Sequence, residues 1–133
     1  MALSFAVNYV AVIAGAIAAV AIGALYYGAL GFGARASRML GASEPRPGPR
    51  SLAIGLVVGL VNAWIIAVLA LSLHASSISD ALLLGVLVWF GFAATFKAAQ
   101  VAFEGRPWGV WAIHAVHDVV VEITLAAVVT LWR

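Results

Sequence analysis

The sequence predicts an all-α integral membrane protein, a bundle of four transmembrane helices arranged as two hairpins. Three observations indicate this class. Of the 133 residues, 65% are hydrophobic and only 9% are charged, whereas soluble globular domains are about half apolar and a quarter charged. Four apolar runs reach the roughly 20 residues that are needed to span a bilayer. These runs are far longer than the strands of a membrane barrel and lack their two-residue alternation.

We expect the four helices to form a single membrane domain that covers residues 1–133. Their expected ranges are about 5–32, 51–73, 80–103 and 108–131. The first run has no basic segment before it and is too long for a signal peptide, so we expect it to be retained as a helix. Short polar turns, "HASSIS" and "EGRP", separate the second helix from the third and the third from the fourth. Ser79 or Asp80 can cap the third helix.

The segment 33–50, between the first two helices, is expected to be a basic, proline-rich cytoplasmic loop. A continuous helix is not expected there because proline interrupts helices, and the segment contains Pro45, Pro47 and Pro49. Basic residues gather in this loop and in the turn after the third helix, namely Arg35, Arg38, Arg46, Arg50 and Arg106. The positive-inside rule places these arginines in the cytoplasm. We therefore expect a bacterial inner membrane protein with both termini outside.

Composition also excludes several kinds of function. The formal net charge of +2 is too small to indicate nucleic-acid binding. The chain has no cysteine, which excludes disulfides, iron–sulfur clusters and thiolate zinc sites. No hydrolase elbow, phosphate loop, dinucleotide fingerprint or zinc-protease motif is found. We expect a protein that is not an enzyme, that binds no cofactor, and whose surroundings are the lipid bilayer.

Small residues recur at helical spacing on three of the predicted helices. Such stripes allow helix backbones to approach closely, and they comprise Gly15, Ala19 and Gly23; Gly55 and Gly59; and Gly91, Thr95, Ala98 and Ala102. Together they predict a tight bundle and favour a homo-oligomer. Tryptophans near the ends of the fourth helix suit the membrane interfaces, namely Trp108, Trp111 and Trp132.

The fourth helix carries ionisable side chains where a lipid-embedded segment is expected to have none. His114, Asp118 and Glu122 are spaced four residues apart, and His117 precedes Asp118. At about 100° per residue these groups share one stripe of a helix. A rise of about 1.5 Å per residue places Asp118 roughly 15 Å into a hydrocarbon core about 30 Å thick.

Polar residues on the other helices are expected to pair with this stripe. By depth, Lys97 lies level with His114, and Asn62 lies level with Asp118. The remaining supporting groups are Gln100, Tyr26 and Tyr27. Because buried charges are costly unless paired, we expect these groups to turn inward, although Lys97 can alternatively extend its amine to the surface. Glu122 is the acidic group with the least obvious partner.

Three interpretations of the stripe stay open. The first is a proton- or small-cation-linked transport or conduction site, in which His114, His117, Asp118, Glu122 and Lys97 form a relay. The second is a metal site, for which His114, His117 and Asp118 are weak candidates. The third is structural: the groups satisfy one another and fix packing, as in an accessory subunit of a larger membrane complex. A small-ligand or lipid-binding role is a further alternative.

The first predicted helix also carries a family resemblance. It reads "NYVAVIAGAIAAVAIGALYYGALGFG" and resembles the opening of the bacterial membrane family catalogued as domain of unknown function 1761, which typically shows Asn-Trp, Ala-Val, Gly-Ala-Leu-Trp-Tyr and Phe-Gly. The matching residues are Asn8, Ala11, Val12, Gly23, Ala24, Leu25, Tyr27, Phe32 and Gly33. "WFGF" (89–92) and "FEGRP" (103–107) are also similar to this family. The resemblance implies the four-helix fold and membrane placement but no activity.

The chain departs from the family pattern at two places in this segment. Tyr9 and Tyr26 stand where tryptophans are usual, which conserves interface anchoring. Gly28 and Ala29 stand where Ser-Pro is common. Because proline breaks helices, we expect this second change to make the cytoplasmic end of the first helix more continuous.

Overall fold

The computed structural model describes residues 2–44 and 46–133, and within them the chain is helical with no strand. The predicted all-α class is therefore confirmed. The elements in chain order are α1 (Tyr9–Gly23), the π-helical segment η1 (Ala24–Ala29), α2 (Phe32–Leu40), α3 (Pro49–Ser72), α4 (Ile78–Val88), the π-helical segment η2 (Trp89–Ala94), α5 (Thr95–Glu104) and α6 (Trp108–Leu131).

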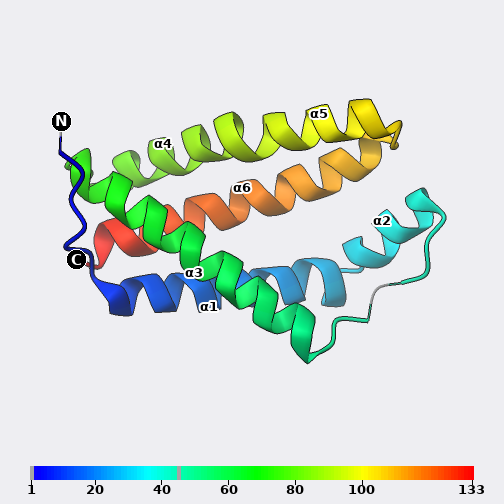
Figure 1. Ribbon diagram of the computed structural model, residues 1–133, viewed down its shortest axis with the longest axis horizontal. Coiled ribbons are helices and arrows are strands. Elements are labelled where there is room, and N and C mark those ends of the chain that lie inside the picture. Colours follow the sequence, from blue (N-terminus) through cyan, green and yellow to red (C-terminus); the bar gives the residue numbers. More distant parts are fainter. Residues whose placement is uncertain (1, 45) are drawn as a thin grey trace.

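These elements form four helices that are long and apolar enough to cross a membrane. They cover Tyr9–Ala29, Pro49–Ser72, Ile78–Glu104 and Trp108–Leu131. Figure 1 shows them running along the long axis of the molecule, with both termini and the α3–α4 turn at one end. We call the opposite end, which holds α2 and the turn at 105–107, the basic end. The four helices identify a membrane protein, because so many exposed apolar side chains require lipid around them.

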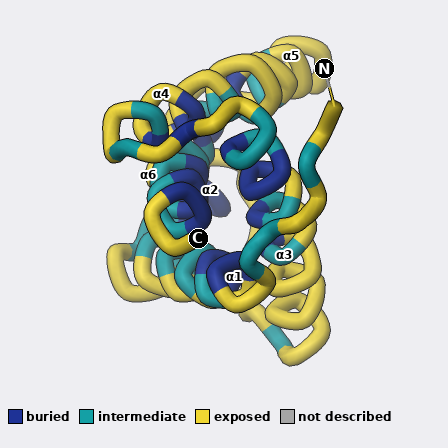
Figure 2. Tube along the Cα trace, turned by 90° about the vertical axis from the view of Figure 1, so that its left-hand side faces the viewer, coloured by how far each residue is buried: buried dark blue, intermediate teal, exposed yellow. Residues whose placement is uncertain are grey.

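Helix α6 is the centre of the bundle. It packs against α1, α3 and α4 along its length, and α1 also packs against α3. Figure 2 shows the buried positions of the helices turned toward one another and the exposed positions turned outward. The two largest fully buried side chains, Ile66 of α3 and Leu125 of α6, lie in the half of the bundle near the termini. This half holds the main apolar core.

Polar side chains cap the beginnings of α1 and α4. Asn8 caps α1 by accepting hydrogen bonds from the backbone N–H groups of Val10 and Ala11. The first helix therefore begins at Tyr9, four residues later than predicted. Ser77 caps α4 in a capping box with Asp80, so Ser77, rather than Ser79 or Asp80, is the N-cap.

The segment that connects α1 to α3 differs from the prediction in two ways. Within the expected loop 33–50, residues 32–40 form α2, whose Arg35 and Arg38 are exposed while Ala36 and Ser37 are buried. The first helix was also expected to be continuous through residue 32, and this prediction is wrong. It widens into a π-helix and breaks at Gly31, whose φ of 77° is left-handed and needs glycine. Pro45, part of the argument for that loop, lies outside the described residues.

Close backbone approach occurs at some of the predicted small residues and at one that was not predicted. A Cβ on Gly59 would lie 3.4 Å from the backbone of Ala16, so α3 and α1 do meet there. Gly55 and Gly91 have nothing within 4 Å of such a Cβ. Among the glycines, the closest approach between two membrane-spanning helices is at Gly85 of α4, where a Cβ would lie 2.7 Å from the Cα of Ile123. Gly85 therefore sets how closely α4 approaches α6.

We expect Gly85→Ala to destabilise the protein by about 1–3 kcal/mol, the usual penalty for overpacking a close contact. The clash is with backbone atoms of α6 next to Glu122, which cannot rotate away as a side chain can. Gly91→Ala is the matched control, because its added Cβ meets open space. Thermal unfolding in detergent measures the stability of both purified variants relative to the wild type. Equal stability of the two variants would contradict this account of the α4–α6 contact.

Candidate functional site

The ionisable side chains of α6 line up on one face of that helix, toward α1, α3 and α5. Asp118 and Glu122 are one helical turn apart, and His114 lies one turn before Asp118. Each of the three makes a hydrogen bond to a side chain from a different neighbouring element. The stripe predicted from the spacing is thus a row of contacts between helices.

Asp118 is held from two sides. The Lys97 ammonium of α5 forms an ion pair with its Oδ2 atom, and His117 Nδ1 lies 3.0 Å from its Oδ1 atom. The Asp118 side chain is 14% exposed and that of Lys97 is 40% exposed, so the pair lies at the edge of the bundle. Lys97 pairs one turn deeper than the prediction placed it, because its long side chain reaches along the helix axis.

Glu122 is the most deeply buried ionisable residue of the stripe, at 7% exposure. Asn62 of α3 donates a hydrogen bond from Nδ2 to Glu122 Oε1 over 2.7 Å. The prediction had placed Asn62 level with Asp118, but α3 begins at Pro49 rather than residue 51, which moves Asn62 deeper relative to α6. Within the described structure the second oxygen, Oε2, is buried and has no hydrogen-bond partner.

The two tyrosines of η1 fasten the first helix to α6. Tyr26 donates a hydrogen bond to the backbone carbonyl of Ile113 over 2.8 Å. The Tyr27 hydroxyl lies 2.7 Å from His114 Nδ1, and its ring packs 4.6 Å from the His117 ring, centroid to centroid. The phenol of Tyr27 and the two imidazoles therefore form one connected group on the wall of the site.

The second π-helical segment approaches α6 from the opposite side, and its contacts were not predicted. Trp89 of η2 donates from Nε1 to the carbonyl of Ala115 over 2.9 Å. Trp111 of α6 donates in return to the carbonyl of Ala94 over 2.9 Å. Trp111 was expected to anchor the membrane interface, but it links two helices instead. Both π-helical segments thus flank the part of α6 that carries the ionisable residues, as such segments often do at functional sites.

Gln100 does not join the site. It is exposed and donates to Glu104 Oε1 over 3.1 Å on the outside of α5. The reason is helical phase. The buried positions of this helical stretch are Ala94 and Val101, and Gln100 points about 110° away from the direction they define at 100° per residue. The other predicted supporting groups, Asn62, Tyr26 and Tyr27, all contact α6.

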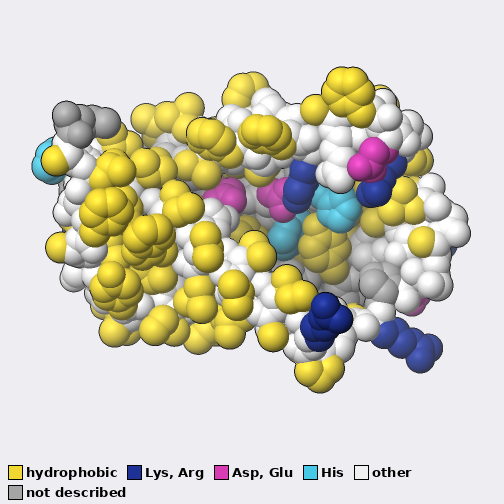
Figure 3. All heavy atoms as spheres, viewed as in Figure 1, with side chains coloured by type: hydrophobic (Ala, Val, Ile, Leu, Met, Phe, Trp, Pro, Cys, Tyr) yellow, Lys and Arg dark blue, Asp and Glu magenta, His cyan; other side chains and the backbone are white. Residues whose placement is uncertain are grey.

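A cavity of about 790 Å³ lies against this row of groups. It extends from the basic end, where Glu44 and Ser51 line it, to the Glu122–Asn62 pair in the middle of the bundle. Lys97, His117 and Asp118 also line it. Figure 3 shows acidic, basic and histidine side chains gathered in a hollow on the face seen in Figure 1, surrounded by hydrophobic side chains. The cavity is therefore open on a side of the bundle as well as toward one end.

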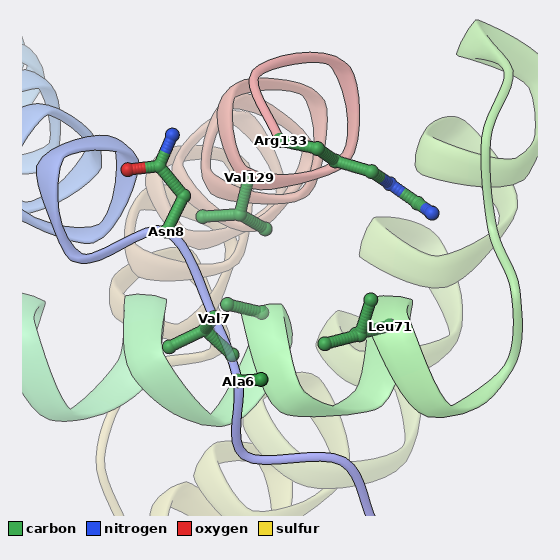
Figure 4. A pocket seen from close by; sticks show the side chains of 7 residues that line it. Ala6, Val7, Asn8, Leu71, Val129 and Arg133 are labelled. Carbon is green, nitrogen blue, oxygen red and sulfur yellow. The ribbon is translucent and has the colours of Figure 1, made fainter.

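A second, much smaller cavity of about 60 Å³ lies near the termini, between the N-terminal segment, α3 and α6. Val7, Leu71 and Val129 line it, and Figure 4 shows the Asn8 and Arg133 side chains pointing away from each other at its rim. Asn8 also donates to the carbonyl of Trp132 over 3.3 Å. This hole is a packing gap where the two ends of the chain meet, and it holds no ionisable cluster.

The arrangement offers proton and cation chemistry more readily than metal binding. Across residues 2–44 and 46–133, no group of three or more His, Asp or Glu side chains is placed to hold a metal ion. His114, His117 and Asp118, the metal candidates, instead use a ring nitrogen or an oxygen on Tyr27, Lys97 or one another. Two buried atoms of the site, Glu122 Oε2 and His117 Nε2, have no hydrogen-bond partner in the part of the chain that the structure describes. A carboxylate oxygen and an imidazole nitrogen can each take up a proton.

Comparison with known proteins gives a family and no function. A family model described as "Protein of unknown function (DUF1761)" matches residues 10–130. This range includes every residue of the site, and the match confirms the resemblance seen in the first helix. The comparison with curated proteins gave no match, and neither did the comparison with solved structures.

The Lys97–Asp118 ion pair can be tested by a double-mutant cycle with Lys97→Met, Asp118→Asn and the double variant. We expect a coupling free energy of about 0.5–3 kcal/mol, since each single change leaves the partner charge unpaired. Thermal or denaturant unfolding in detergent gives the four free energies of unfolding. Strictly additive effects would mean that the two side chains do not interact.

Proposed function

The chain belongs to the DUF1761 family of proteins of unknown function, and on the chemistry of its site we propose that it is a small membrane transport module that binds a proton or a small cation at Glu122. The observation that carries this proposal is that Glu122 lines the cavity while its buried Oε2 atom has no hydrogen-bond partner among the described residues. A carboxyl group in apolar surroundings needs a proton or another cation to neutralise it. Asn62 donates a hydrogen bond but brings no positive charge.

The other groups would then have supporting roles. Lys97 and Asp118 neutralise each other and keep the cavity wall polar. His117, with a free Nε2 atom, would relay protons between the cavity and Asp118. Tyr27 and His114 would hold this wall in place through their hydrogen bond. No step in this scheme requires bond chemistry on a substrate, so we propose a protein that is not an enzyme.

The shape of the cavity supports transport by alternating exposure rather than through an open pore. Beyond Glu122, Leu125 and Ala126 of α6 are fully buried against α3, near Ala63 and Ile66. These dry turns separate the cavity from the end that holds the termini. A bound ion would cross only after this core rearranged.

A role as an accessory subunit is the second candidate, and one observation favours it. The Lys97 side chain is 40% exposed, and Figure 3 shows charged side chains on a face of the bundle that lipid would otherwise cover. A second copy of the chain, or a different membrane subunit, would shield this edge. We propose a homo-oligomer on the same ground. An accessory subunit would carry no flux of its own.

We further propose that the protein lies in a bacterial inner membrane with both termini outside. The arginines at 35, 38, 46, 50 and 106 all lie at the basic end, and the positive-inside rule assigns that end to the cytoplasm.

The absence of cysteine from the chain allows a direct test of this orientation. Ser76→Cys, in the α3–α4 turn, should react with a membrane-impermeant maleimide in spheroplasts. Ser43→Cys, next to α2, should react only after the membrane is opened; both serines are exposed. The reverse labelling pattern would show the opposite orientation.

The transport proposal predicts that Glu122→Gln abolishes flux. We would measure proton and monovalent-cation flux in liposomes that contain the purified protein, and we expect flux in the wild type to fall to the level of empty liposomes in this variant. Glutamine keeps the size of the side chain and an acceptor for Asn62 but cannot carry a negative charge.

Glu104→Gln is the matched control. It is the same chemical change as Glu122→Gln, but Glu104 is exposed at the end of α5, outside the cavity. It should retain wild-type flux. Circular dichroism and thermal unfolding check that each variant is folded. No flux in the wild type, or full flux in Glu122→Gln, would refute the proposal and favour the accessory role.

A further inference from the structure

The cavity is larger than a proton or a bare metal cation requires. Its volume of about 790 Å³ falls within the range of about 300–1,000 Å³ that is typical of pockets for drug-sized molecules. Most of its wall is made of small apolar residues such as Ala19, Val20, Gly23 and Val58. Such a wall gives no ligands to an inorganic ion but packs well against an apolar body.

The charges that line the cavity select for a cation. Three carboxyl groups line it, those of Glu44, Asp118 and Glu122, against one ammonium group, that of Lys97. Lys97 is already paired with Asp118. Glu122 is 93% buried, given its 7% exposure, and has one oxygen without a partner. An anionic molecule would therefore meet an uncompensated acidic group on the cavity wall.

We propose that the cavity binds a monovalent organic cation with an apolar body, whose positive centre pairs with Glu122. This deepens the proposed function and depends on it, because the same carboxyl group would exchange a proton for the organic cation. A single ion pair suffices for a bulky organic cation, whereas a bound inorganic cation such as Mg²⁺ or Ca²⁺ requires several oxygen ligands. The Tyr27 ring on the cavity wall adds a surface over which a cation is attracted.

The opening of the cavity suits a ligand of this kind. The first half of α3, residues 51–58, is exposed throughout, and Leu52, Gly55 and Val58 of this half line the cavity. Figure 1 shows this half of α3 diverging from α5, and Figure 3 shows the polar groups visible between hydrophobic side chains. A cation with an apolar body partitions toward the membrane interface, from which this lateral opening is reachable.

The test is binding of tetraphenylphosphonium to the purified protein in detergent, measured by titration calorimetry beside tetraphenylborate. The two ions have the same shape and opposite charges. We expect the cation to bind with release of protons into a weakly buffered solution and the anion not to bind. Glu122→Gln should weaken binding at least tenfold, and Glu104→Gln should leave it unchanged. Equal binding of both ions, or wild-type binding in Glu122→Gln, would overturn the proposal.

A second pair of variants tests whether the organic cation occupies this cavity. Gly55→Phe adds bulk inside the cavity at a position where a Cβ has no atom within 4 Å, and Gly91→Phe adds the same bulk on the exposed side of η2. Gly55→Phe should weaken binding of the organic cation at least tenfold. Gly91→Phe should leave binding unchanged.

The combined results distinguish the two failures. Glu122-dependent flux without tetraphenylphosphonium binding would refute the organic cation and leave the transport module standing. Absence of both would refute both. Binding that survives Gly55→Phe would show that the cation occupies another surface, and this too would overturn the inference.

Discussion

The polar side chains of α6 must find their partners inside the bundle, because the bilayer core offers no water, and the rest of the structure depends on this constraint. Asp118 ties α6 to α5 through Lys97, Glu122 ties it to α3 through Asn62, and His114 ties it to η1 through Tyr27. The three contacts lie on successive turns of one helix face. One face of α6 thus sets the positions of all three other membrane-spanning helices near the middle of the bundle, and the cavity is the space that remains between them.

The two π-helical segments are part of the same arrangement. In an α-helix two adjacent side chains diverge by about 100°, yet Tyr26 and Tyr27 both reach α6, at Ile113 and His114. The wider π-helical turn over Ala24–Ala29 accommodates this. On the other side of α6, Trp89 is the first residue of η2, and its indole N–H donates a hydrogen bond to the carbonyl of Ala115. The motifs "GALYY" and "WFGF", which carried the family resemblance, therefore coincide with the segments that contact the part of α6 that carries the ionisable residues.

Composition and spacing were enough to predict the class of the fold and the face of α6 that carries the site, because hydrophobic length and helical period are local properties. They also pointed to Asn62, Lys97, Tyr26 and Tyr27. They could not predict which partner each takes, since this depends on helix tilt and on where each helix begins. Gln100 was misplaced for a different reason, because its position around the helix turns it to the outside of α5. The π-helical turns and the tight approach at Gly85 left no periodic signal. The short helix α2 is amphipathic, but the prolines that follow it led the whole segment to be predicted as a loop.

Helix α3 has two halves with different surroundings, and Glu122 lies where they meet. Residues 51–58 of α3 are exposed or line the cavity, whereas from Gly59 onward the helix packs tightly, first on Ala16 and then on α6. Moving the first half toward α5 would shrink the cavity and leave the core intact. Opening a path beyond Glu122 would instead separate Leu125 from its buried neighbours, at about 25 cal/mol for each Å² of apolar surface uncovered. Access to Glu122 is therefore easy from the basic end and restricted from the other, so any exchange across the bundle is limited by this core.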